Sequence, residues 1–442
     1  MVSRPLLNRR VQRLARLIAP ACVIVACTTA DARAGNGVRE LRVWAFGAEG
    51  EAVAPMVRDF ERANPDVRVR VQQIPWTAAH EKLLTAFVGG ALPDVAQLGN
   101  TWVPEFQALK ALTPLDSALA SDAAHMPRAD YFPGVLATNV VDDTLYGVPW
   151  YVDTRVMFYR SDLLRRAGVA RPPATWAEWR DALARVQRVQ PAGSVPMLMP
   201  LDEWAQPVIL ALQSGAPLLA DHGTRGFFRD ARFRRGFEFY VDLFRDGLAP
   251  PLANTQVSNV YQEFAAGRIA MYISGPWNVS EFRKRMPDTL QGAWATAPLP
   301  GPTEPGVSLA GGSSLVVMRG ARHPDDAMRF IAFLSDPARQ AAFYEATGDL
   351  PARRSAWNAP RLAGDPYLAA FRDQLARVVP TPAVAEWELI ATDIAAAAER
   401  AARGTQSIDV ALAALDAEVD GVLEKRRWLQ AHRVVAARPG KR

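Results

Sequence analysis

The sequence predicts an α/β fold with two lobes, each assembled from discontinuous pieces of the chain. Segments with strand patterns alternate with segments of helical periodicity, an order typical of βαβ units and a largely parallel sheet. Breaks rich in Pro, Gly or charge, near residues 147–155, 298–305 and 348–351, divide this pattern. We expect lobe one to comprise residues 35–149 and 301–350, and lobe two to comprise residues 150–300 and 351–442.

The first part of the chain illustrates the alternation. Val67-Arg68-Val69-Arg70-Val71 alternates apolar and charged residues, the pattern of a strand with one buried face. Val53, Val57 and Phe60 recur at helical spacing, and Asn64-Pro65 supplies a stop for that helix. By these criteria we predict strands at Leu41–Phe46, Val67–Val71 and Pro93–Leu98, and helices at Glu49–Ala63, His80–Val88 and Val103–Leu109.

Leu145–Arg160, with the sequence LYGVPWYVDTRVMFYR, is predicted to cross between the lobes. Its apolar run Val156–Tyr159 predicts a buried strand. Asp153 and Arg155 precede this run, and buried charges need polar partners. We therefore expect Tyr151 and Asp153 to face a cleft between the lobes. The alternative is an edge strand whose charges are solvated.

The rest of the chain continues the α/β pattern. Thr175-Trp176-Ala177-Glu178 has the residues of a capping box, which starts a helix running to about Val189. We expect Trp176 and Trp179 to pack in the core. Further strands are predicted at Ile269–Ile273 and Leu315–Met318, and further helices at Phe227–Phe244, Pro324–Leu334, Pro337–Ala346 and within the Ala-rich tail at 383–425.

The N-terminal segment has the organisation of a secretory signal peptide. Several Arg precede the apolar run Leu17–Ala26, and Ala32-Arg33-Ala34 is a cleavage pattern, so we assign residues 1–34 to the signal. Ile24-Val25-Ala26-Cys27 also resembles a bacterial lipobox, so lipid anchoring at Cys27 is the alternative to cleavage after Ala34. Either route predicts a periplasmic location.

Charge and cysteine content exclude several classes of function. The chain has 51 Lys and Arg against 46 Asp and Glu, but residues 1–34 hold six of the Arg and one Asp. The remainder is balanced in formal charge, so we predict no nucleic-acid partner. Both cysteines, Cys22 and Cys27, lie in the signal, so a chain cleaved after Ala34 has neither disulfides nor thiol chemistry.

The familiar signatures of enzymes are absent from the sequence. It contains no G-x-S-x-G elbow, no G-x-x-x-x-G-K-[ST] loop and no G-x-G-x-x-G fingerprint. The histidines are scattered, without carboxylates at ligand spacing, so we predict no metal and no cofactor. Carboxylates are numerous, and a secreted carbohydrate-active enzyme with a pair of acids therefore stays open as an alternative.

Aromatic residues beside predicted turns favour a carbohydrate ligand. Trp44 ends the first strand, Trp102 follows Gly99-Asn100-Thr101, and Trp277 follows Gly275-Pro276. Trp204 follows two acidic residues, and Tyr151 lies at the crossing. Such rings can cover the apolar face of a pyranose while nearby amides and carboxylates bind its hydroxyls. Core or hinge packing is the alternative for any single ring.

An ordered set of segments resembles a known family. The segments are VWAFGAEGEAVAPMVRDFERANPDVRV, PDVAQLGNTWVPEF, YGVPWYVDTRVMFYRSDLL with PATWAEW, AAGRIAMYISGPWNV, APLPGP followed by SLAGGSSLVV, and GDLPARRSAW. The chain resembles extracellular solute-binding proteins of bacterial sugar ABC importers, of the maltose/trehalose-binding type. The resemblance implies a periplasmic-binding-protein fold, in which discontinuous lobes joined by a three-crossing hinge close on sugar. It also implies a non-catalytic monomer that delivers the sugar to a membrane permease.

The resemblance further implies ligand-binding positions. Glu49 matches an acid that bonds sugar hydroxyls, Tyr151 and Asp153 match a pair at the crossing, and Trp277 matches a ring that stacks from lobe two. With the aromatic pattern, the predicted ligand-binding residues are Trp44, Glu49, Asn100, Trp102, Tyr151, Asp153, Trp204, Trp277, Gly311, Gly312, Ser313 and Arg354. Relatives often carry an aromatic near Ser313 and Arg-Pro where this chain has Val379-Pro380, so the resemblance leaves the exact sugar open.

Other ligands and functions remain as alternatives. A polyol or a glycerophospho compound is the main alternative ligand, but a phosphate would need Arg, Lys or a helix N-terminus in the cleft. The predicted cleft is aromatic and acidic, which favours a sugar. A chemoreceptor or a surface adhesin subunit could use the same fold.

Overall fold

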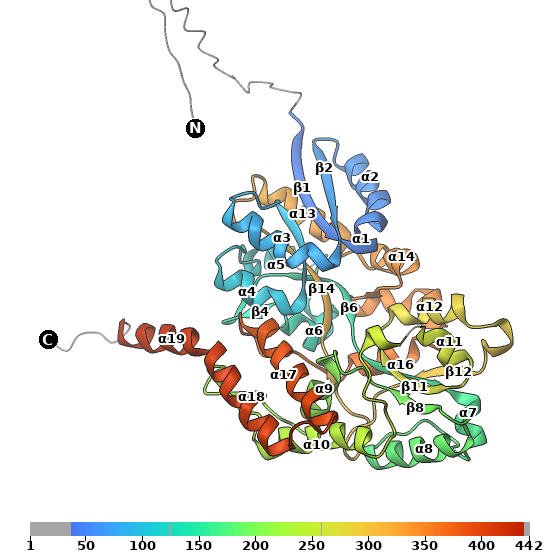
Figure 1. Cartoon of the computed structure of the whole chain (residues 1–442). Coiled ribbons are helices and arrows are strands. Elements are labelled where there is room, and N and C mark those ends of the chain that lie inside the picture. Colours follow the sequence, from blue (N-terminus) through green and yellow to red (C-terminus); the bar gives the residue numbers. More distant parts are fainter. Residues whose placement is uncertain (1–36, 123–124, 258, 437–442) are drawn as a thin grey trace, which may run out of the picture. The chain divides into compact units, whose positions relative to one another are not determined.

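The computed structural model describes residues 37–122, 125–257 and 259–436 (Figure 1). The predicted signal peptide at residues 1–34 and the predicted anchor position Cys27 lie outside the described residues. The account below concerns the compact unit that begins at Arg39. Among its described helices, none is both long enough and apolar enough to cross a membrane.

The first sheet has six strands in the order β15-β6-β14-β3-β1-β2. Their bounds are β1 (Arg39–Phe46), β2 (Val67–Ile74), β3 (Val95–Gly99), β6 (Val148–Asp153), β14 (Gly311–Val317) and β15 (Leu350–Pro351). The alternation predicted for β2 is confirmed, because Val67 and Val69 are buried while Arg68 and Arg70 are exposed. The sheet is mixed, since β1 runs parallel to β2 and β3 whereas β14 runs antiparallel to β3 and β6.

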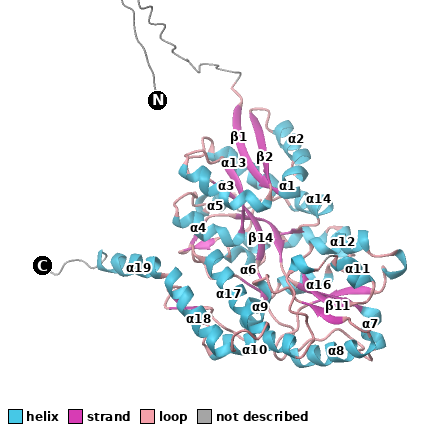
Figure 2. Ribbon diagram, in the orientation of Figure 1, coloured by secondary structure: helices cyan, strands magenta, loops and turns pink. Residues whose placement is uncertain are grey.

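Helices pack on both faces of this sheet (Figures 1 and 2). Their bounds are α1 (Gly47–Ala52), α2 (Ala54–Ala63), α3 (Trp76–Val88), α4 (Val103–Ala108), α5 (Asp116–Ser121), α6 (Pro133–Ala137), α13 (Pro324–Leu334) and α14 (Pro337–Thr347). The single helix predicted at Glu49–Ala63 is wrong, because the chain forms two helices that meet at Val53. Pro55 lies in the first turn of α2, where its missing N–H is tolerated, but it would break a continuous helix.

The second sheet has four strands in the order β12-β7-β11-β8. Their bounds are β7 (Val156–Arg160), β8 (Val195–Leu198), β11 (Ile269–Ser274) and β12 (Trp294–Ala297). The buried strand predicted at Val156–Tyr159 is confirmed as β7. Sequence patterns predicted neither β8 nor β12, which are short and lack alternation. The prediction of a largely parallel sheet is wrong, because the first sheet is mixed and, among the strands described for the second sheet, only β8 and β11 pair in parallel.

Helices also flank the second sheet, and the last helix of the chain extends away from it (Figures 1 and 2). Their bounds are α7 (Ser161–Arg166), α8 (Trp176–Val189), α9 (Ala205–Gln213), α10 (Ala231–Arg245), α11 (Val260–Ala265), α12 (Trp277–Arg285), α16 (Ala369–Leu375), α17 (Trp387–Ala402), α18 (Ile408–Val422) and α19 (Glu424–Ala436). The capping box predicted at Thr175 and Glu178 is confirmed at the start of α8. The helix predicted from Phe227 begins later, at Ala231, because the Asp230 side chain caps it.

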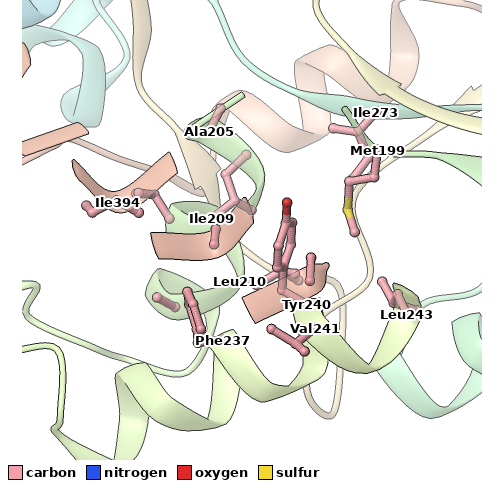
Figure 3. Close-up of a cluster of buried hydrophobic side chains, with 14 of the residues drawn as sticks. Met199, Ala205, Ile209, Leu210, Phe237, Tyr240, Val241, Leu243, Ile273 and Ile394 are labelled. Atoms are coloured by element: carbon pink, nitrogen blue, oxygen red, sulfur yellow. The ribbon is translucent and has the colours of Figure 1, made fainter. Parts of the chain in front are cut away.

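The core beside the second sheet is built from α8, α9, α10 and α17. Trp176 and Trp179 are buried in it, as predicted. Figure 3 shows Tyr240 of α10 surrounded by apolar side chains such as Ile209 and Met199. Helices α9 and α10 lie so close that a Cβ at Gly236 would stand 2.4 Å from the carbonyl oxygen of Leu210. Glycine is therefore required at this contact.

The strands of the two sheets come from different parts of the chain. The first sheet uses residues 39–153 and 311–351, and the second uses residues 156–297. Strand β6 stays paired in the first sheet as far as Asp153, and β7 joins the second sheet at Val156. We propose that the two predicted lobes follow this division, with the first lobe extended through β6.

Candidate ligand-binding cleft

A cavity of about 590 Å³ lies where residues from both sheets and their flanking loops meet. This volume is in the range of sites for small molecules. All the predicted ligand-binding residues except Trp44 and Arg354 line it, namely Glu49, Asn100, Trp102, Tyr151, Asp153, Trp204, Trp277, Gly311, Gly312 and Ser313. The structure therefore brings together positions that are far apart in the sequence.

Glu49, in the first turn of α1, is held by two side chains. The Tyr151 hydroxyl donates to Glu49 Oε1 over 2.7 Å, and Trp76 Nε1 donates to the same oxygen over 3.1 Å. The Glu49 residue is only 7% exposed, so these donors compensate part of the cost of removing a carboxylate from water. The carboxylate is thus fixed before any ligand enters.

Tyr151 connects Glu49 to the interior of the first sheet. Gln97 Nε2 donates to the Tyr151 hydroxyl over 3.2 Å and to Ser313 Oγ over 3.3 Å. Gln97 is itself oriented by the backbone N–H of Phe46, which donates to its side-chain oxygen over 2.7 Å. Burial raises the pKa of Tyr151 well above its usual value, and Asp349 and Glu49 add to the shift. The hydroxyl therefore stays protonated and acts as a donor.

The glycine-rich start of β14 forms another wall of the cleft. Gly312 has φ +117°, and a Cβ there would lie 2.3 Å from the carbonyl oxygen of Tyr151. Only glycine can occupy this position without displacing β6. Asn100 supports the same wall, because its Nδ2 donates to the Gly311 carbonyl over 3.1 Å and its Oδ1 accepts from Ser314 Oγ over 2.8 Å. Asn100 is thus largely occupied by bonds within the protein.

Aromatic rings approach the cavity from both sheets. Trp76 and Trp102 contact each other at 5.8 Å between ring centroids in an edge-on arrangement. Trp204 packs edge-on against Trp387, with centroids 5.6 Å apart. Trp277, the first residue of α12, is 38% exposed, which is unusual for so large a ring. Its exposed part is therefore available to a ligand in the cavity.

His80 of α3 supports the Trp102 ring from behind, at 4.9 Å between centroids. Its Nε2 lies 2.6 Å from Glu105 Oε2, and this hydrogen bond raises the pKa of His80 above its usual value. The sequence places this histidine at the start of a predicted helix and gives no sign of a contact with Glu105 or Trp102. The structure instead gives it a place in the packing of a cleft ring.

The cavity carries more negative than positive charge. Asp153 forms an ion pair with Arg155, whose guanidinium lies 4.7 Å from the centroid of the Trp277 ring. Asp349, between α14 and β15, contributes a further carboxyl. Burial raises the pKa of Asp349 to about 7, and the negative charges of Glu49 and Asp153 add to the shift. The residues that line this cavity thus include three acids and one guanidinium.

Two predicted ligand-binding residues lie elsewhere. Trp44 is on β1, and its half-buried ring packs against a cluster of apolar side chains that includes Leu83 of α3. The Lys82 Nζ atom lies 5.3 Å from the centroid of this ring. Arg354 lines a separate cavity with Trp357 and Arg372. Alternation along β1 and the turn after β15 send these side chains away from the cleft. We therefore leave both residues out of the proposed ligand set.

Sequence analysis also missed several residues of the cleft. Trp76 follows Pro75, so the rule that selected Trp277 after Pro276 would have found it. Asp349 lies in the Gly348–Pro351 break, which was interpreted only as a crossing. Thr347 and Thr381 also line the cavity, and no sequence signal marks them.

The site is built for binding and shows no metal centre. In the described ranges, no group of three or more His, Cys, Asp or Glu side chains could hold a metal ion. An α/β fold in which residues from around both sheets line one cavity of this size defines a binding protein for a small ligand. The chain belongs to the bacterial extracellular solute-binding protein family, whose model matches residues 46–341.

Solved structures and curated relatives agree with this assignment. The sugar-binding protein MalE of Xanthomonas citri is 51% identical, with a TM-score of 0.86 over 89% of this chain and 99% of that chain. The acarbose-binding GacH receptor of Streptomyces glaucescens, at 24% identity, shares the fold with a TM-score of 0.75 over 88% of this chain and 99% of that chain. The diacetylchitobiose binding protein DasA of Streptomyces coelicolor is 24% identical over 82% of this chain and 84% of its own length. The predicted solute-binding protein family, the periplasmic-binding-protein fold and the prediction of a non-catalytic receptor are confirmed. The three-crossing hinge stays a prediction.

Proposed function

We propose that this chain is the substrate-binding protein of an ABC sugar importer. It binds a small oligosaccharide, an α-glucoside such as maltose or trehalose, in the cleft and delivers it to a membrane permease. The observation that carries this proposal is the combination, in one cavity, of the partly exposed Trp277 ring with the anchored carboxylates of Glu49 and Asp153. The 51% identity to a sugar-binding protein supports it.

The chemistry of the cavity suits an uncharged polyhydroxylated ligand. The ring of Trp277 covers the apolar C–H face of a pyranose, and Trp76 and Trp102 add further aromatic surface to the cavity. Glu49 and Asp153 accept hydrogen bonds from hydroxyls, and charge-assisted bonds of this kind are stronger than neutral ones. Closure of the two proposed lobes would remove water from these contacts and strengthen them.

The proposed location is the periplasm, the compartment in which an importer of this kind collects its substrate. The family description places its members outside the cell. Delivery then requires a partner in the membrane, the transmembrane subunits of the permease. The sequence patterns given above allow two forms of the exported protein. One is a soluble protein cleaved after Ala34, and the other is a lipoprotein anchored through Cys27.

The alternative ligands fit the cavity less well. A glycerophospho compound brings a phosphate, but the only guanidinium that lines this cavity, that of Arg155, is already paired with Asp153. The carboxylates of Glu49 and Asp153 would repel an anion. The match to a solute-binding protein family argues against a carbohydrate-active enzyme that uses these carboxylates.

A thermal-shift screen followed by calorimetry tests the proposal. Maltose and trehalose should raise the melting temperature by mass action, and glycerol 3-phosphate and sorbitol should not. Chromatography of the sugar after overnight incubation should recover it intact. A shift with the phosphate alone, or hydrolysis of the sugar, would contradict the proposed function.

A further inference from the structure

Asp349 differs from the other two carboxyls of the cleft in how it is held. It lies between the end of α14, where Gly348 has φ +85°, and β15, which pairs with β6 beside Tyr151. Glu49 accepts hydrogen bonds from Tyr151 and Trp76, and Asp153 is paired with Arg155. In the described part of the chain, no Lys, Arg or His forms an ion pair with Asp349. Its surroundings therefore offer little compensation for a negative charge.

The groups that face Asp349 come from several elements. Glu49 approaches from α1, Tyr151 and Asp153 come from β6, and Thr347 comes from the last turn of α14. Arg155, the nearby cation, is engaged by Asp153 and lies over the Trp277 ring. Two like charges and partial burial thus act on this carboxyl, and among the described residues the Thr347 hydroxyl is the contact that counteracts them. These are the conditions that favour the neutral acid.

The donor and acceptor balance of the cleft gives the neutral acid a use. A sugar hydroxyl has one hydrogen to donate and two lone pairs to accept. The anchored carboxylates of Glu49 and Asp153 are acceptors only, so they use the hydrogens and leave the lone pairs without partners. A protonated Asp349 adds a donor beside these two acceptors. Ligand binding also removes water, which favours the neutral form further.

We propose that Asp349 contacts the bound sugar as a neutral acid that donates a hydrogen bond to a sugar oxygen, so that sugar binding takes up a proton. This inference rests on the proposed function. Because the pKa of Asp349 in the ligand-free protein is about 7, binding at pH 6 finds the acid mostly protonated. At pH 8 the proton must be taken from solvent, which weakens the apparent affinity.

Calorimetry with maltose and trehalose at pH 6 and pH 8 tests the inference. The apparent affinity should be about tenfold lower at pH 8, because only the protonated fraction is competent. At pH 8, titrations in phosphate and Tris, which have different ionisation enthalpies, should report uptake of close to one proton per sugar. This second measurement needs no variant and is independent of folding effects.

Two variants assign the proton to Asp349. Asp349→Asn keeps the shape and supplies a permanent donor, so its affinity should be the same at pH 6 and pH 8, with no proton uptake. Glu345→Gln is the matched control, because Glu345 lies on α14 shortly before Asp349, pairs with Arg361 over 3.4 Å and does not line the cleft. It should keep the pH dependence of the unmodified protein.

The possible outcomes separate the inference from the proposed function. Sugar binding that is independent of pH, or stronger at pH 8, would overturn the inference and leave the proposed function intact. An unchanged pH dependence in Asp349→Asn would overturn it as well. Failure of both sugars to bind at either pH would overturn the proposed α-glucoside and the inference with it.

Discussion

The hydroxyl group of Tyr151 on β6 donates a hydrogen bond of 2.7 Å to Glu49 Oε1 on α1, two residues that are 102 positions apart in the chain. The bond fixes an acceptor at the wall of the cleft and ties α1 to the first sheet. It also leaves Glu49 with a buried charge that depends on this donor and on Trp76. Several predictions about the cleft depend on this relationship and its neighbours.

Tyr151→Phe should lower the free energy of unfolding by about 1–2 kcal/mol, because Glu49 then loses a donor while it stays buried. Sugar affinity should fall severalfold as the carboxylate becomes mobile. Tyr240→Phe is the matched control, since the buried Tyr240 hydroxyl has no hydrogen-bond partner among the described residues. Chemical denaturation should show the control to be neutral or stabilising. An equal loss of unfolding free energy in Tyr151→Phe and Tyr240→Phe would show that the hydrogen bond from Tyr151 to Glu49 does not stabilise the fold.

Trp277→Ala should weaken sugar binding by about 1–3 kcal/mol, the scale of an aromatic contact that a ligand buries. The fold should persist, because the ring is already 38% exposed. Trp428→Ala removes a ring that is 58% exposed on α19 and does not line the cleft, so it should leave affinity unchanged. If Trp277→Ala unfolds at room temperature, the ring is part of the core and not of the site.

Asp153→Asn should reduce sugar affinity by about 1.5–3 kcal/mol, because one charged acceptor is replaced by a neutral group. If Asp153 serves only its ion pair with Arg155, calorimetry will instead find unchanged affinity. Asp162→Asn is a suitable control, because Asp162 also pairs with an Arg two positions away, Arg160, outside the cleft. The control should alter stability without altering affinity.

Asp349→Asn should stabilise the ligand-free protein more at pH 8 than at pH 5. The pKa of Asp349 is raised from 3.8 to about 7 in the folded state, so the folded state binds its proton more tightly than the unfolded state. Stability of the unmodified protein therefore declines as pH rises between these two values, and the variant escapes this loss. Melting temperatures at the two pH values check the sign, and a larger advantage at pH 5 would contradict it.

Gly312→Ala should lower the free energy of unfolding by about 2 kcal/mol or more, because φ +117° and the contact with the Tyr151 carbonyl leave no room for a side chain. Gly421→Ala should have the opposite sign and stabilise α18 by up to about 1 kcal/mol, since nothing lies within 4 Å of a Cβ there. Urea denaturation of the pair gives the comparison. A stable Gly312→Ala protein would show that β14 can move away from β6.

Local patterns in the sequence determined much of the fold. A few neighbouring residues decide each of three predicted features. The structure shows alternating burial in β2, the capping box at Thr175, and the Trp after Pro276 in the lining of the cavity. Pro55 was a local signal too, and its effect on the predicted helix at Glu49–Ala63 was overlooked. The resemblance to a family predicted most of the residues that line the cleft. The order of the motifs along the chain can be recognised in a sequence, whereas contacts between distant residues cannot.

Only the tertiary structure decided which side chains meet. The bond from Trp76 to Glu49, the position of Asp349 beside two other acids, and the approach of Gly312 to Tyr151 all join segments that are distant in sequence. The same packing sends Trp44 and Arg354 away from the cleft. Periodicity fixes which face of a strand or helix is apolar, but strand order and the return of β14 into the first sheet fix what that face contacts. The charge state of Asp349 depends on those contacts, so it could not be predicted from the sequence alone.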